Sequence, residues 1–209
     1  MAPSVKSMSA RTPARSVYVA LLRGVNVGGN KKVPMRDLAA DWSDGGCTEV
    51  RTYIQSGNVV FFAPPESPKA RPGRTPEETD GHKRLENLLS ARIADRFGFP
   101  VPVVVRTADE FRQVVSRNPF LKTGADVASL HVGFLADRPS KRQVAALDRN
   151  RSPGDFFEVR DREIYLFLPN GLGASKLTNA YFDSTLGSVS TFRNWRTVSK
   201  LLEMTQPLG

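Results

Sequence analysis

Cysteine and histidine are scarce in this chain. Its single cysteine, Cys47, excludes a disulfide within the chain, which fits a reducing compartment such as the cytoplasm. Its two histidines, His82 and His131, lie far apart in the sequence, and this excludes a typical zinc site built from Cys and His ligands. The sequence therefore predicts no metal and no cofactor, a buried Cys47, and histidines that are structural or exposed to solvent.

Long hydrophobic runs are also missing. No run approaches the roughly 18 to 20 apolar residues that a membrane-spanning helix needs. Residues 1–15 carry basic side chains but lack the apolar core of a secretory signal, so we interpret them as a disordered tail or as a start assigned upstream of Met8. These absences predict a cytoplasmic protein that does not enter a membrane.

Acidic residues are outnumbered. The chain has 30 Lys and Arg against 21 Asp and Glu, which gives a formal net charge of +9. Such a balance favours polyanionic partners such as nucleic acid, phosphates or acidic proteins. Arginine exceeds lysine, so compositional drift in an arginine-rich genome is an equally good explanation. With 209 residues and 40% hydrophobic residues, the chain can form one large domain or two small ones.

The first half of the chain has the order β-α-β-β-α-β. Apolar runs predict buried strands, apolar residues at helical spacing predict helices, and a proline-rich stretch over residues 64–81 predicts a flexible insertion. Pro102 inside the last strand indicates a sheet edge. In order, we expect a strand over 17–22, a helix from 35 that ends at Gly45-Gly46, strands over 50–55 and 59–62 joined by a turn, a helix over 85–97, and a strand over 101–105.

The second half repeats this order of elements. We expect a connecting helix over 109–117, a strand over 130–135, a helix over 141–147, a hairpin of strands 156–159 and 164–168, a helix over 175–186, a strand over 189–192, and a last helix from Trp195. The repeat lies in the elements and not in matching residues. It predicts an α+β protein of two tandem ferredoxin-like modules, residues 16–106 and 107–209, with a connecting helix and a C-terminal helix.

Several separated motifs resemble those of the DUF1697 family, and they extend over about residues 18–204. This resemblance implies a pair of ferredoxin-like α+β domains, in agreement with the order of elements. It implies no catalytic residues, because none are established for that family. The motifs are Leu22-Arg23-Gly24-Val25-Asn26-Val27-Gly28-Gly29, Lys32-Val33-Pro34-Met35, Arg51-Thr52-Tyr53-Ile54-Gln55-Ser56-Gly57-Asn58-Val59, Asn118-Pro119-Phe120, Ser175-Lys176-Leu177-Thr178-Asn179 and Thr191-Phe192-Arg193-Asn194-Trp195.

A loop rich in glycine and asparagine follows the first strand. Gly24 and Gly29 have the spacing of P-loop glycines, but Asn30 follows where a P-loop needs lysine and then a hydroxyl residue, so the register excludes a P-loop. The dinucleotide-binding pattern of glycines is absent too. Either the glycines serve only the geometry of the loop, or they let the backbone approach an anion. Basic residues at this loop are Arg23, Lys31 and Lys32.

The segment Gln55-Ser56-Gly57-Asn58 is typical of a hairpin turn. A functional interpretation is that its amide and hydroxyl groups, beside Arg51, lie at the same end of the sheet as the glycine loop. Ser56 as a nucleophile would need a neighbouring base, and no histidine stands out for that role.

Two later motifs also bear groups that bind anions. Ser175 is expected to cap a helix whose amides attract anions, with Lys176 and Asn179 on one face. Adjacent helical residues point in different directions, which disfavours a Ser-Lys dyad. Arg193 forms a basic edge with Arg196 and Lys200, and we favour solvated side chains there over phosphate contacts.

The sequence thus predicts a protein that binds a phosphate-bearing ligand, a nucleotide or nucleic acid, in a basic cleft without catalysis. An enzyme acting on a small anionic substrate and a structural or interaction protein remain alternatives. Catalytic residues and oligomeric state are not indicated. The candidate ligand-binding residues are Arg23, Asn26, Lys31, Lys32, Arg51, Gln55, Ser56, Asn58, Lys176, Asn179 and Arg193.

Overall fold

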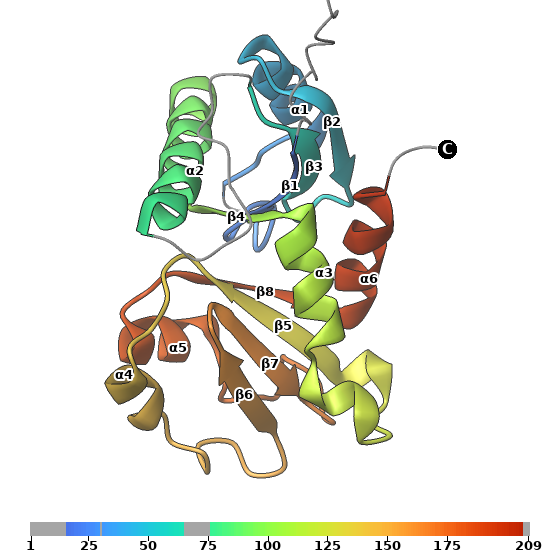
Figure 1. The fold of residues 1–209 in the computed structure, drawn as a ribbon, viewed down its shortest axis with the longest axis vertical. Coiled ribbons are helices and arrows are strands. Elements are labelled where there is room, and N and C mark those ends of the chain that lie inside the picture. Colours follow the sequence, from blue (N-terminus) through green and yellow to red (C-terminus); the bar gives the residue numbers. More distant parts are fainter. Residues whose placement is uncertain (1–15, 30, 65–75, 207–209) are drawn as a thin grey trace, which may run out of the picture.

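The computed structural model describes residues 16–29, 31–64 and 76–206 and contains two four-stranded antiparallel sheets (Figure 1). The first sheet has the strand order β2-β3-β1-β4, which is the ferredoxin-like order. Its elements are β1 (Val17–Leu22), α1 (Met35–Asp44), β2 (Thr48–Tyr53), β3 (Asn58–Phe62), α2 (Pro76–Phe97) and β4 (Val103–Thr107).

The second sheet repeats this topology, with the strand order β6-β7-β5-β8. The predicted α+β fold of two ferredoxin-like modules is therefore confirmed. The elements of the second half are α3 (Ala108–Ser116), the short 3-10 helices η1 (Pro119–Lys122) and η2 (Val127–Ser129), β5 (Leu130–Leu135), α4 (Lys141–Ala145), β6 (Phe156–Arg160), β7 (Glu163–Phe167), α5 (Asn179–Leu186), β8 (Ser190–Asn194) and α6 (Trp195–Met204).

Each sheet buries one face under its own pair of helices. Side chains alternate between the two faces of a strand, so Tyr18, Ala20 and Leu22 of β1 point toward α1 and α2. In the second sheet, Ile164 and Leu166 pack against α5 in the same way. Close packing on that side leaves no room for a side chain at Gly133 of β5, where an added Cβ would lie 2.6 Å from the ring of Phe192.

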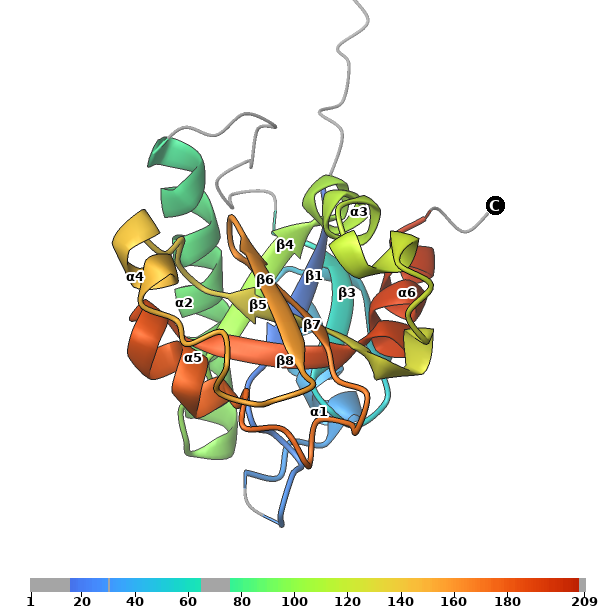
Figure 2. The ribbon, with the colours of Figure 1, turned by 90° about the horizontal axis from the view of Figure 1, so that it is seen from below.

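The two remaining sheet faces pack against each other. Val19 and Leu21 of the first sheet share a core with Val132 and Phe134 of the second, and α3 and α6 close one side of that core. Figure 2 shows the strands of the two sheets crossing, with α3 and α6 together at one side. Modules of this topology that recognise RNA use this face to stack bases. Here it is buried, so bases cannot stack on either sheet.

The boundaries of several elements differ from those predicted. Helix α5 begins at Asn179 and not at Ser175, because the Thr178 side chain accepts the hydrogen bond from the Tyr181 amide. Ser175 instead accepts from the Leu177 amide in the preceding loop. Helix α4 ends at Ala145, two residues early.

The predicted flexible insertion over residues 64–81 is wrong at its end, since α2 already begins at Pro76. Residues 65–75 of that insertion, and the predicted tail over 1–15, lie outside the described residues. The predicted edge position of the strand over 101–105 is confirmed, because β4 is the outer strand of its sheet, but β4 begins at Val103, so Pro102 precedes the strand and does not lie inside it.

Candidate functional site

Asn26 fixes the shape of the glycine loop. It adopts a left-handed backbone conformation with φ of 56°. Its side-chain amide donates to the carbonyls of Val33 (2.8 Å) and Gln55 (2.6 Å), and its side-chain oxygen accepts from the Val33 amide. Asn26 therefore closes the loop and ties it to the β2–β3 turn.

Arg193 of β8 is buried where the two modules meet, with 8% of its surface exposed, so the prediction that it is solvated is wrong. Its guanidinium donates to the carbonyls of Leu22 (2.8 Å), Ser56 (3.1 Å) and Gly57 (3.2 Å) and to the side chain of Asn58. Burial lowers the pKa of Arg193 to about 10, which leaves it charged at neutral pH. One cation thus fastens the end of β1 and the β2–β3 turn to the second module.

Arg23 makes a second link between the modules. Its guanidinium pairs with Asp183 of α5 at 2.8 Å and donates to the Ser190 carbonyl. Asp183 accepts from the Ser190 amide and hydroxyl, and Asn179 donates to the same hydroxyl at 3.0 Å. Arg23 and Asn179 are therefore held by internal contacts at the junction.

Arg51 joins β2 to the end of α6. Its guanidinium donates to the Met204 carbonyl at 2.6 Å, and a cation at that position complements the negative end of the helix.

The other candidate cations, Lys31, Lys32 and Lys176, are exposed. Lys31 donates to the Pro100 carbonyl at 3.3 Å, whereas Lys32 and Gln55 are exposed. Lys176 is exposed in the loop before α5, so it does not share a helix face with Asn179 as predicted. The sequence motifs thus bring Arg23, Ser56, Asn58, Asn179 and Arg193 together at the junction of the modules, and leave Lys31, Lys32, Gln55 and Lys176 on surface loops.

Beside this junction lies an open groove of about 860 Å³. One wall comes from the first module, at the end of β2, and the other from η2, the end of β8 and the outward face of α6. Its lining residues are Tyr53, Val127, Ala128, Asn194, Trp195, Arg196, Ser199, Lys200 and Glu203.

Local sequence explains how α6 builds its wall. The Asn194 side chain accepts from the Thr197 amide and starts the helix, as predicted. Trp195 is 8% exposed and packs into the core between the sheets, as predicted, while it still lines the groove. Arg196 and Lys200 are exposed residues of the same helix. They are four positions apart and so lie on the same side of it.

The contacts at the junction also hold the groove in shape. Arg193 precedes Asn194 on β8 and bonds Asn58, whose amide in turn donates to the Tyr53 carbonyl at 3.1 Å. Arg51, two residues before Tyr53, holds the far end of α6. Residues predicted to bind a ligand therefore position the groove, but none of the eleven candidates, which all lie within the described residues, lines it.

The groove carries a positive balance. Lys200 pairs with Glu203 at 2.9 Å, and this hydrogen bond raises the pKa of Lys200. Arg196 is exposed and forms no ion pair with any described residue. Arg196 and Lys200 are exposed, as predicted, whereas the sequence does not single out Tyr53 or Val127, because their place in the groove depends on how the two modules pack.

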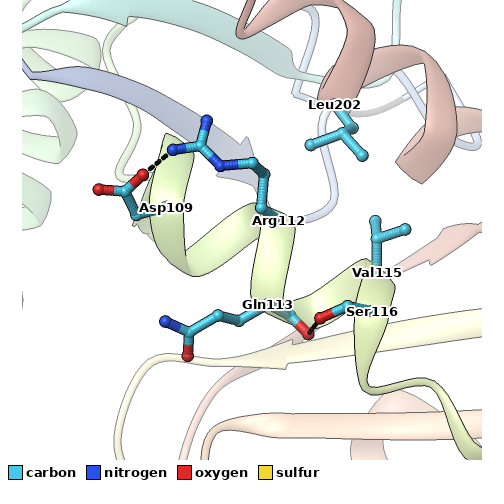
Figure 3. A pocket seen from close by; sticks show the side chains of 6 residues that line it. All are labelled: Asp109, Arg112, Gln113, Val115, Ser116 and Leu202. Carbon is cyan, nitrogen blue, oxygen red and sulfur yellow. Dashed lines mark hydrogen bonds and ion pairs between the residues drawn. The ribbon is translucent and has the colours of Figure 1, made fainter.

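A second, shallow pocket of about 590 Å³ lies between α3 and α6 (Figure 3). Arg112 pairs with Asp109 and the Ser116 hydroxyl donates to the Gln113 carbonyl at 3.1 Å, whereas the side-chain amide of Gln113 forms no hydrogen bond with a described residue. No aromatic side chain from the described part of the chain lines this pocket, unlike the groove beside Tyr53.

The opposite side of the junction holds a cluster of buried charges that the sequence did not reveal. Arg106 pairs with Glu163 at 2.9 Å, and the Glu86 carboxylate accepts from the amide of Val105 in the outer strand β4 at 2.9 Å. His82 lies 3.3 Å from Glu110, and burial lowers the pKa of His82 to about 4. These contacts join α2, α3 and the two sheets, so the structural role expected for His82 fits them.

Other groups give no sign of a site. Cys47 is buried, as predicted, and burial raises the pKa of its thiol to about 11. Within the described parts of the chain, no three His, Cys, Asp or Glu side chains are placed to hold a metal ion. None of the helices over those residues has both the length and the apolar character that crossing a membrane requires.

Comparisons with known proteins agree with the fold. The structure is similar to that of the conserved bacterial protein SP0830 from Streptococcus pneumoniae, with a TM-score of 0.65 and 20% identity over 92% of this chain and 100% of that chain. No curated protein sequence matches the chain. The family model of DUF1697, a protein family of unknown function, matches residues 16–165. Because this match covers well over half of the sequence, the chain belongs to the DUF1697 family.

Proposed function

We propose that the protein binds a phosphate-bearing ligand, a nucleotide or nucleic acid, in the groove beside α6 and does so without catalysis. The observation that carries this proposal is an aromatic side chain beside two exposed cations in one groove. Tyr53 lines the groove from the first module, and Arg196 and Lys200 are exposed on α6, whereas the buried Trp195 adds little surface. Aromatic rings stack on bases, and the cations neutralise phosphate charge.

The surroundings of the groove support binding of an anion. It runs along α6 from the N-terminal end, where the helix dipole is positive, and Arg196 lies in the first turn. The formal net charge of +9 also attracts polyanions over a distance.

The same groove offers little for acid–base chemistry. Among the described residues that line it, Glu203 is the only carboxylate, and it is exposed and bonded to Lys200. General acid–base catalysis needs a group whose proton affinity is tuned to the reaction, usually by burial or by neighbouring charges. We therefore favour binding over an enzyme acting on a small anionic substrate.

Calorimetric titration with ATP, GTP and a short oligonucleotide at low salt tests this proposal. We expect binding of at least one of these ligands, weakened at least fivefold by combined Arg196→Ser and Lys200→Ser substitutions. Lys141 and Arg142 are exposed on α4, so their combined substitution by serine is a control with the same change in net charge. Absence of binding, or equal weakening in the control variant, would show that the groove is not a phosphate site.

A further inference from the structure

On the basis of the proposed function, we infer that the ligand of the groove is a single strand of nucleic acid at least two nucleotides long. Arg196 and Lys200 would contact successive phosphates of this strand, while its bases lie against Tyr53 and Val127. The inference rests on the spacing of the cations and on the apolar side chains that line part of the groove.

The spacing of the two cations fits a repeating backbone. Arg196 and Lys200 are one helical turn apart, which separates them by about 6 Å along the axis of α6. Successive phosphates of an extended strand are one nucleotide apart and can meet both cations in turn. The phosphates of a mononucleotide are joined directly to one another, so they lie closer together than these two cations.

The lining of the groove suits unpaired bases. Tyr53, Val127 and Ala128 supply aromatic and apolar surface, and Val127 is 56% exposed, whereas Trp195 is 8% exposed and adds little. Stacking on such surface tolerates any base, because every base has a flat face. A duplex keeps its bases stacked inside and offers the groove only its backbone. The aromatic lining therefore favours a single strand over a duplex.

Glu203 competes with the strand for Lys200. Their hydrogen bond is 2.9 Å long, but both side chains are about half exposed or more, and exposed ion pairs contribute little stability. A phosphate can replace the carboxylate at Lys200. Removing the charge of Glu203 is then expected to strengthen binding, whereas removing Lys200 weakens it.

Fluorescence anisotropy with end-labelled oligothymidylates of one, two, four and eight nucleotides tests this inference on the full chain. We expect affinity to rise at least tenfold from one to four nucleotides. Two phosphate contacts on a single strand predict a slope of about −1.4 in log K against log salt. We expect Arg196→Ser or Lys200→Ser to reduce that slope by about 0.7 each, and Glu203→Gln to tighten binding about threefold.

The outcomes separate this inference from the proposed function. If thymidine mononucleotide binds as tightly as the tetranucleotide, or a duplex binds more tightly than either strand, the single-strand inference is wrong and the phosphate site stands. If no oligonucleotide and no nucleotide binds, both are wrong. If the Lys141→Ser, Arg142→Ser control loses as much affinity as the α6 variants, binding follows net charge and not the groove. Since all the substituted side chains are exposed, thermal unfolding is expected to match wild type within about 2 °C.

Discussion

At the scale of single residues, Arg193 shows that an arginine in a conspicuous motif can have a structural role. An arginine in a surface motif suggests recognition of phosphate, yet here the acceptors of its guanidinium are neutral groups of the chain itself. The planar fork of arginine can serve several carbonyls at once, which the ammonium of lysine cannot. Arg193 therefore lies at a buried position where apolar side chains could pack instead. Its hydrogen bonds hold the two modules in one arrangement.

Replacing Arg193 with methionine should be strongly destabilising. The side-chain oxygen of the buried Asn58 and the Ser56 carbonyl would lose their donor, so we expect the free energy of unfolding in urea to fall by about 3 to 5 kcal/mol. Arg196→Met is the control, because Arg196 is exposed, and we expect it to change stability by less than about 0.5 kcal/mol. A loss below about 1 kcal/mol for Arg193→Met would mean that the network contributes little.

At the scale of elements, the sequence predicts nearly every helix and strand, and β1, β5, β6, α1, α4 and α6 begin at the predicted residue, whereas the starts of α2 and α5 differ from those predicted. Ser175 and Thr178 both suit a helix N-cap, and only the packing of Phe182 and Leu186 against the second sheet selects Thr178. The burial of Arg193 is not predictable from the local sequence for a related reason. Its burial depends on the β2–β3 turn, which is far away in the sequence.

His82 of α2 is the residue from which we expect the clearest dependence of stability on pH. His82 faces Glu110, Arg162 and Arg106 across the junction, and its pKa is about 4 against 6.5 for an unperturbed histidine. Between these two pH values, His82 is protonated in the unfolded chain and neutral in the folded chain. The free energy of unfolding therefore falls as the pH is lowered. Glu110, whose pKa is lowered, adds a loss in the same direction, whereas Glu86, whose pKa is raised, opposes it.

We therefore expect His82→Gln to flatten the dependence of stability on pH. Urea unfolding at pH 7 and pH 5 should show that wild type loses about 2 kcal/mol more than the variant over this interval. The comparison uses the difference between two pH values, so a constant cost of the substitution cancels. Equal losses in the two proteins would mean that His82 binds its proton in the folded state as easily as in the unfolded chain.

At the scale of the whole molecule, the way the two sheets pack follows from a feature visible in the sequence. The run Val17–Leu22 is apolar at every position, which indicates a strand buried on both faces. Helices α1 and α2 cover one face of this strand. The other face needs a second layer to cover it, and the second sheet supplies that layer. The groove beside α6 could not be predicted in this way, because Tyr53 and Trp195 meet only once the crossing of the sheets is set.

A shared core between the sheets should make the two modules unfold as one unit. Leu38 is fully buried against the first sheet and belongs to a core separate from that of β7. We expect Leu38→Ala to destabilise the chain by about 2 to 5 kcal/mol and to lower hydrogen-exchange protection of β7 amides by the same free energy as β1 amides. Leu88→Ala, on the exposed side of α2, is the control and should leave both strands nearly unchanged. If β7 kept its protection while β1 lost it, the modules would open independently, and the groove that both of them form would lose one wall whenever the first module opened.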